Sequence, residues 1–183
     1  MKKKLLSVIY VKLILCCTIF IFSCSHPFAQ TDYTISKEPG NPKMKMLTGI
    51  INKNLIEKDT SFKWYAPNKN TYAPDTAVVK SMVRAKKQQL QFVIFGGTWC
   101  EDTQFILPKF FKLQEMSVMS EDNVSLFAVY PNKKTLGNIS AIFGITKVPT
   151  IIVMKDGKEM GRVVEYGKTG KWDAELADII NTH

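Results

Sequence analysis

A single cysteine in the middle of the chain has the surroundings of a reactive thiol. Cys100 follows an apolar run and two glycines, and the residues after it have the composition of a helix start. Unpaired backbone N–H groups and the helix dipole stabilise negative charge at such a position, which favours a nucleophilic thiolate suited to disulfide exchange. Glu101 and Asp102 oppose this effect because they place two carboxylates beside the sulfur.

Thr103 lies three residues after Cys100, within one helical turn. Its hydroxyl could donate a hydrogen bond to the sulfur, but it cannot attack a mixed disulfide. Cys100 and Thr103 are therefore the candidate catalytic residues. The other cysteines are Cys16, Cys17 and Cys24. All three lie in or beside an N-terminal signal, so the domain that follows it has Cys100 as its one cysteine. An external thiol would therefore have to release any partner bound to Cys100.

The composition is that of a globular domain. Hydrophobic residues make up 45% and charged residues 22% of the 183 residues, which are ordinary values. The formal net charge is +9, but no basic cluster is interleaved with aromatic residues, so we expect no nucleic-acid partner. With one such cysteine and no placed histidine, we expect no metal site. No cofactor is indicated, and we expect a monomer.

The first 29 residues predict an export signal. Lysines at positions 2 to 4 precede an apolar stretch whose core, 13–22, is too short to span a bilayer. Two processing routes fit this pattern: cleavage after Ala29, or a lipoprotein signal that ends before Cys24 and leaves that cysteine lipidated. An uncut N-terminal membrane anchor is a third alternative. The favoured routes predict an exported protein of the periplasm or cell envelope, either soluble or lipid-anchored to the membrane.

Residues 30–60 predict a linker and a short accessory helix. The stretch from Thr31 to about Pro42 is polar and contains proline and glycine, which is typical of a linker. Between Lys43 and Lys58, apolar residues recur at roughly helical spacing. The main domain is then expected over residues 61–183.

The elements that position Cys100 are expected to alternate between strands and helices. In order, the pattern predicts a short strand at 62–65, a helix from Asp75 or Thr76 to about Lys87, a buried strand at 90–95, a helix from about Cys100 with Pro108 inside it, a strand at 124–130, a short helix at 135–143, a hairpin over 149–166 and a closing helix at 171–181. This order indicates an α/β fold with a central mixed sheet flanked by helices and a C-terminal antiparallel hairpin and helix.

The residues around Cys100 and a downstream proline resemble those of the thioredoxin family. Trp99 precedes the cysteine, Pro108 falls inside the following helix, and Val148-Pro149 opens a later apolar stretch. The resemblance implies a thioredoxin-like fold in which a cis-proline, Pro149, faces Cys100. It also implies that Trp99, Val148 and Pro149 shape a groove for the substrate.

The chain departs from that family at two positions. Thr103 stands where the family has its second cysteine, and Ile94 stands at the place of a buried acid that assists proton transfer. The resemblance covers about residues 61–180 and looks like that of exported bacterial thioredoxin-like proteins with Ser or Thr at the second position. It implies a monothiol disulfide-exchange protein that forms mixed disulfides through Cys100 with protein or small-molecule partners.

Three functions are compatible with these residues. In the leading one, a thiol oxidoreductase, Cys100 attacks a partner disulfide. In the second, a redox-inactive binding module, the groove holds a peptide and the cysteine is incidental. In the third, a one-cysteine peroxidase, Cys100 is oxidised to sulfenic acid; the absence of a proline shortly before Thr98 argues against it. The exposure of the sulfur and its distance from Pro149 discriminate between the first two.

Overall fold

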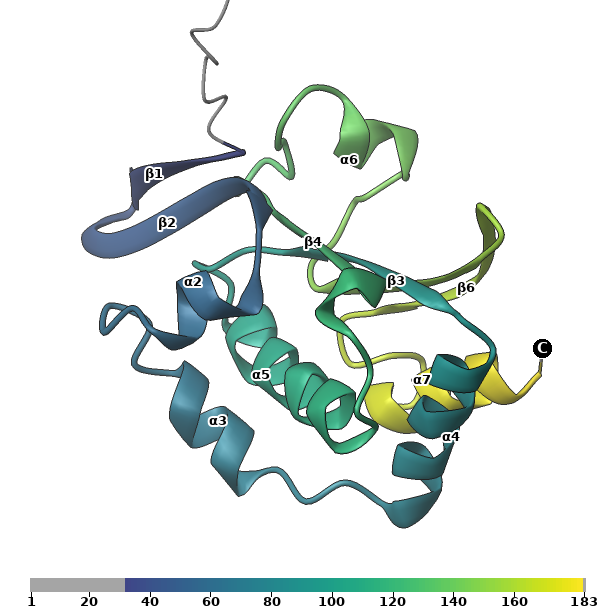
Figure 1. The fold of residues 1–183 in the computed structure, drawn as a ribbon. Helices are drawn as coiled ribbons and strands as arrows, with labels where there is room; N and C mark the ends of the chain where they lie inside the picture. The colour runs from purple at the N-terminus through teal and green to yellow at the C-terminus, as the bar shows by residue number, and fades with distance from the viewer. Residues whose placement is uncertain (1–31, 183) are drawn as a thin grey trace, which may run out of the picture. The chain divides into compact units, whose positions relative to one another are not determined.

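A six-stranded mixed sheet forms the centre of residues 32–182, the part of the chain that this computed structural model describes (Figure 1). The strand order is β1-β2-β4-β3-β5-β6. Neighbouring strands are antiparallel except β3 and β4, which run parallel. The predicted α/β fold with a central mixed sheet is therefore confirmed. The strands are β1 (Tyr33–Glu38), β2 (Asn41–Ile51), β3 (Gln91–Gly96), β4 (Val124–Ala128), β5 (Thr150–Lys155) and β6 (Lys158–Val164).

Helices cover both faces of the sheet, as predicted (Figure 1). Helices α3, α4, α5 and α7 lie on one face, where α3 contacts α5 and α4 contacts α7. The short helix α6 lies on the opposite face. The helices are α2 (Lys53–Glu57), α3 (Tyr65–Thr71), α4 (Thr76–Lys87), α5 (Glu101–Met116), α6 (Ile139–Ile142) and α7 (Trp172–Asn181), with a 3-10 turn at Glu121–Asn123.

Local signals account for the start of α4 and for the C-terminal hairpin. The Asp75 side chain accepts a hydrogen bond of 2.7 Å from the Ala77 N–H group, which caps α4 at the predicted residue. At the turn between β5 and β6, Asp156 and Gly157 have φ angles of 51° and 75°. An Asp-Gly pair favours this conformation, and it matches the twist of the two flanking strands.

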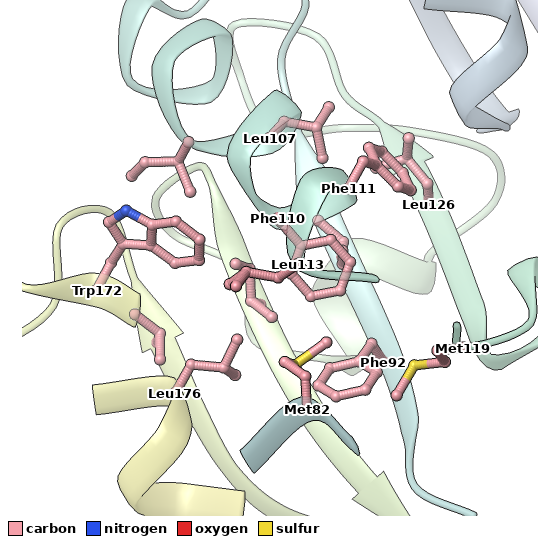
Figure 2. Close-up of a cluster of buried hydrophobic side chains, with 14 of the residues drawn as sticks. Met82, Phe92, Leu107, Phe110, Phe111, Leu113, Met119, Leu126, Trp172 and Leu176 are labelled. Atoms are coloured by element: carbon pink, nitrogen blue, oxygen red, sulfur yellow. The ribbon is translucent and has the colours of Figure 1, made fainter. Parts of the chain in front are cut away.

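The larger hydrophobic core lies between the sheet and helices α4, α5 and α7 (Figure 2). The rings of Phe92 in β3 and Phe110 in α5 meet edge to face with their centroids 5.4 Å apart. Ile94 is fully buried in the same cluster. The position that the resemblance assigns to a proton-transferring acid is therefore filled by a packed apolar side chain.

A second, smaller cluster covers the other face of the sheet. The ring of Phe95 stacks on that of Phe127 with centroids 5.1 Å apart. Trp99 and Cys100 pack against this cluster, which therefore supports the loop after β3. Its buried members are Phe95, Val129, Ile145, Val148 and Ile152.

The linker predicted from Thr31 to about Pro42 is wrong for the described residues, and the accessory helix predicted between Lys43 and Lys58 is present only in part. β1 and β2 form an antiparallel hairpin, and β2 also pairs with β4, so the hairpin extends the sheet. Only Lys53–Glu57 is helical. β2 pairs with β1 along one edge and, from Gly49 to Ile51, with β4 along the other. In this conformation Leu47 and Ile51 bury their side chains in the main core, and such tertiary contacts override the local helical periodicity.

The strand predicted at residues 62–65 is also wrong. Tyr65 begins helix α3, and both Phe62 and Tyr65 are buried in the larger core. The export signal predicted for residues 1–29 and the lipidation site at Cys24 lie outside the described residues. Between residues 32 and 182, no helix is both long enough and apolar enough to cross a membrane.

Candidate thiol site

Cys100 occupies the position immediately before helix α5. Its backbone is extended, with φ −87° and ψ 123°, and Glu101 is the first helical residue. The Cys100 N–H group donates to the Gly97 carbonyl at 2.9 Å, and the Gln104 N–H group donates to the Cys100 carbonyl at 2.9 Å. The thiol makes no capping hydrogen bond to the helix. The side chain is therefore free to face a neighbouring segment.

That neighbouring segment is the turn that leads into β5. The Cys100 thiol donates a hydrogen bond of 3.3 Å to the carbonyl oxygen of Val148, and the Val148–Pro149 peptide bond is cis. Cys100 is half-buried, whereas Val148 is 3% exposed. The fold thus brings together a partly accessible sulfur and a segment that lies 48 residues further along the chain.

The side chain of Trp99 packs against the loop between β3 and α5. Its indole N–H group donates a hydrogen bond of 2.8 Å to the Val129 carbonyl. The ring lies so close to Gly97 that a Cβ atom on that residue would be 2.6 Å from it. The ammonium group of Lys133 lies 5.0 Å from the ring centroid, within range of a cation–π interaction. The Gly97 position therefore requires glycine because of this close approach.

Thr103 is buried beneath the loop, with 1% of its surface exposed. Its hydroxyl oxygen accepts a hydrogen bond of 3.2 Å from the Gly97 N–H group. Within residues 32–182, the expected hydrogen bond between Thr103 and the sulfur is not formed; the partner of the sulfur is the Val148 carbonyl. The physical reason is that a buried backbone N–H group needs an acceptor, and the Thr103 hydroxyl supplies it.

The loop before Cys100 is also held by polar contacts that the sequence pattern did not single out. The Thr98 hydroxyl accepts a hydrogen bond of 3.1 Å from the Leu47 N–H group. The Thr98 carbonyl accepts one of 2.9 Å from the Gln104 side chain, and the Gln104 carbonyl accepts one of 3.1 Å from Asn68. A polar residue two positions before Cys100 was the sole sequence signal for this arrangement.

Phe105 in α5 and Tyr166 after β6 form an exposed aromatic pair. The rings of Phe105 and Tyr166 lie with centroids 5.8 Å apart, and the two side chains are 40% and 36% exposed. Partial burial, together with the negative charge of Asp102, raises the pKa of Tyr166 above its ordinary value.

The position of the sulfur suits thiol chemistry. No cluster of three or more His, Cys, Asp or Glu residues within 32–182 is placed to hold a metal. The half-buried sulfur lies at the start of a helix, where negative charge is stabilised, and next to a backbone segment that could receive a partner chain. These features suit a nucleophilic attack on a disulfide.

Comparisons with known proteins match the fold of this domain. The family model Thioredoxin matches residues 75–181. A thioredoxin of Alicyclobacillus acidocaldarius subsp. acidocaldarius is 28% identical over 90 residues, covering 48% of this chain and 79% of that relative. A thioredoxin of Echinococcus granulosus is 27% identical over 85 residues, covering 46% and 74%. A crystal structure of a protein of unknown function from Pseudomonas aeruginosa has a TM-score of 0.51 at 14% identity, covering 72% of this chain and 92% of that one, and this likeness concerns the fold alone.

Proposed function

This chain belongs to the thioredoxin family, and we propose that it acts as a monothiol disulfide-exchange protein of the cell envelope. The fold and the family support a thiol-disulfide oxidoreductase type of function. One observation carries the finer proposal: the half-buried Cys100 thiol lies 3.3 Å from the Val148 carbonyl. A sulfur in the packed interior, or one remote from this segment, would favour binding without chemistry.

The proposed step is a thiol–disulfide exchange. The Cys100 thiolate attacks one sulfur of a partner disulfide, a new S–S bond forms to Cys100, and the second partner sulfur leaves as a thiolate. The partner is a protein or a small-molecule disulfide. Since residues 32–182 hold no second cysteine, an external thiolate then attacks the partner sulfur of the mixed disulfide. A new S–S bond joins the external thiol to the partner, and Cys100 leaves as a thiolate.

The Val148 segment is proposed to position the partner. When Cys100 loses its proton, the hydrogen bond from the thiol to the Val148 carbonyl is lost, and that oxygen becomes free to accept an N–H group from an extended partner segment. Trp99 and Pro149 would border the docked chain. Loss of the Cys100 proton would then both activate the sulfur as a nucleophile and free the Val148 carbonyl for the partner.

The placement in the cell envelope rests on residues 1–29 and includes two forms, one soluble and one lipid-anchored at Cys24. Both forms have passed an export step, so both should be recovered outside the cytosol. Recovery of the full-length chain in the cytosolic fraction alone would contradict this part of the proposal.

The test of the exchange step uses the full chain and a disulfide-bonded peptide, with mass spectrometry to detect the mixed disulfide and peptide mapping to locate it. We expect an adduct on Cys100 in the wild type and none at that position in Cys100→Ser. Cys24→Ser is the matched control, because it removes a cysteine and leaves the adduct on Cys100 intact. Equal capture of the peptide by the wild type and by Cys100→Ser would end the proposal.

A redox-inactive peptide-binding module is the second candidate. It is favoured by Ile94, which is fully buried at the place assigned to a proton-transferring acid, and by Thr103 in place of a second cysteine. Both substitutions remove parts used for turnover, while the groove would remain. Peptide binding by a folded protein whose Cys100 resists iodoacetamide would support this candidate over the exchange function.

A further inference from the structure

We infer that Thr98 is a positioning residue. Through it, two elements that precede the family-matched region, β2 and α3, hold the Cys100 thiol in place. The inference rests on the proposed function of Cys100. The matched region begins at residue 75, whereas β2 and α3 precede it. Both of these elements are linked to the loop before Cys100 by hydrogen bonds.

The first link comes from β2. This strand pairs with β4 only over residues Gly49 to Ile51, and Gly49 lies opposite Ala128, the last residue of β4. Leu47 therefore lies past the end of β4. Its N–H group would lack an acceptor there, and the Thr98 hydroxyl supplies one at 3.1 Å. Both residues are 2% exposed. Because a buried N–H group without an acceptor is costly, this contact ties the hairpin to the loop.

The second link comes from α3 through the first turn of α5. The Asn68 side-chain amide donates to the carbonyls of Gln104 at 3.1 Å and Trp64 at 3.0 Å. The Gln104 side chain in turn donates to the Thr98 carbonyl at 2.9 Å. Thr98 is thus held at its hydroxyl by β2 and at its carbonyl by α5, which is itself joined to α3.

The consequence concerns geometry at the sulfur. Cys100 follows Thr98 by two residues, and its thiol must meet both a disulfide and the Val148 segment. Reacting atoms have to approach within about 3–3.5 Å in a defined orientation. A loop released from β2 would keep its thiol but lose the fixed spacing to Val148. Exchange with a docked peptide should therefore suffer more than exchange with a small disulfide, which needs no docking.

The experiment compares Thr98→Val, which lacks the acceptor, with Thr98→Ser, which keeps it. Rates of exchange are measured with a disulfide-bonded peptide and with 2-hydroxyethyl disulfide. For Thr98→Val we expect a fall of about tenfold with the peptide and of less than about twofold with the small disulfide, and recovery in Thr98→Ser. Thr34→Val is the matched control, because it removes a hydroxyl from the β1–β2 hairpin whose one hydrogen-bond partner among residues 32–182 is the Thr48 carbonyl.

If Thr98→Val does not fold, Gln104→Met provides the second variant, because it removes the amide donor to the Thr98 carbonyl and leaves β2 in place. The same selective loss with the peptide is expected. Equal rates in Thr98→Val and the wild type, or an equal loss with both disulfides, would overturn the positioning role. A wild type that reacts with neither disulfide would instead refute the proposed function itself.

Discussion

Replacing Thr103 by valine separates a structural role for this residue from a catalytic one. Valine matches threonine in shape but has no hydroxyl, so the Gly97 N–H group loses the acceptor that it contacts at 3.2 Å. Gly97 is buried, and Thr103 is 1% exposed, so water does not replace the lost partner. The sulfur of Cys100 keeps its own partner, the Val148 carbonyl.

The expected cost follows from the buried donor. Leaving a buried N–H group without an acceptor costs about 1–3 kcal/mol, and valine leaves no cavity that would add to this. We therefore expect the free energy of unfolding to fall by about 2 kcal/mol. With a urea dependence of about 2 kcal/mol per molar, the unfolding midpoint should shift by about 1 M. The rate of exchange with 2-hydroxyethyl disulfide should stay within about twofold of the wild type, since the hydrogen bond to the sulfur is unchanged.

The control variant is Thr103→Ser, which keeps the hydroxyl and removes only the methyl group that lies beside Gly96. Its stability should fall by about 1 kcal/mol, the value of one buried methyl group. The reasoning is refuted if Thr103→Val unfolds at the wild-type urea concentration yet loses most of its reactivity. That result would assign the Thr103 hydroxyl to the sulfur.

Two other regions yield predictions. Gly97→Ala places a Cβ atom 2.6 Å from the Trp99 ring, so we expect a loss of about 1–3 kcal/mol in the free energy of unfolding and a changed tryptophan emission; urea titration followed by fluorescence measures both. Burial alone would raise the pKa of Glu115, but hydrogen bonds from Lys69 and Lys53 together lower it below its ordinary value of 4.5. The resulting stabilisation is present above pH 4.5 and is lost as the pH falls below that value, because the Glu115 carboxylate becomes protonated. The urea midpoint of the wild type should therefore fall more steeply in acid than the urea midpoint of Glu115→Gln.

Each of these predictions has a control in the same chain. Gly40→Ala meets only the flexible carboxylate of Glu38, so it should leave stability unchanged, and a loss equal to that of the Gly97 variant would contradict the steric explanation. Glu38→Gln removes a carboxylate that forms no ion pair among residues 32–182. If Glu115→Gln and the wild type lose stability in parallel below pH 4.5, the ion pairs of Glu115 do not stabilise the fold.

Several elements were predictable because their determinants are local. Asp75 caps α4 through the N–H group of Ala77, only two residues away. The turn at Asp156-Gly157 is decided by the backbone conformations that these two residue types tolerate. The position of Cys100 before α5 followed from an apolar run, a glycine turn and a helical pattern in direct succession. In each case the deciding residues are neighbours in the chain.

The segment before residue 60 was not predictable in the same way. The apolar residues between Met46 and Ile51 fit a helical spacing, yet they form β2, because β1 and β4 supply partners for both edges of the strand. Those partners lie elsewhere in the chain, and short apolar segments take the structure that their neighbours allow. The same limitation concealed the contact between Leu47 and Thr98, which are 51 residues apart.

By itself, the sequence determined that a lone thiol would stand at a helix start within a thioredoxin-like α/β fold, because the residues that specify this motif are contiguous. Only the tertiary structure decided which groups the thiol and its neighbours form hydrogen bonds with. It assigned the Thr103 hydroxyl to a backbone N–H group rather than to the sulfur, and it brought Val148 to 3.3 Å from Cys100. The physical reason is that buried donors and acceptors must pair with whatever group folding places beside them, and that choice depends on contacts between distant segments.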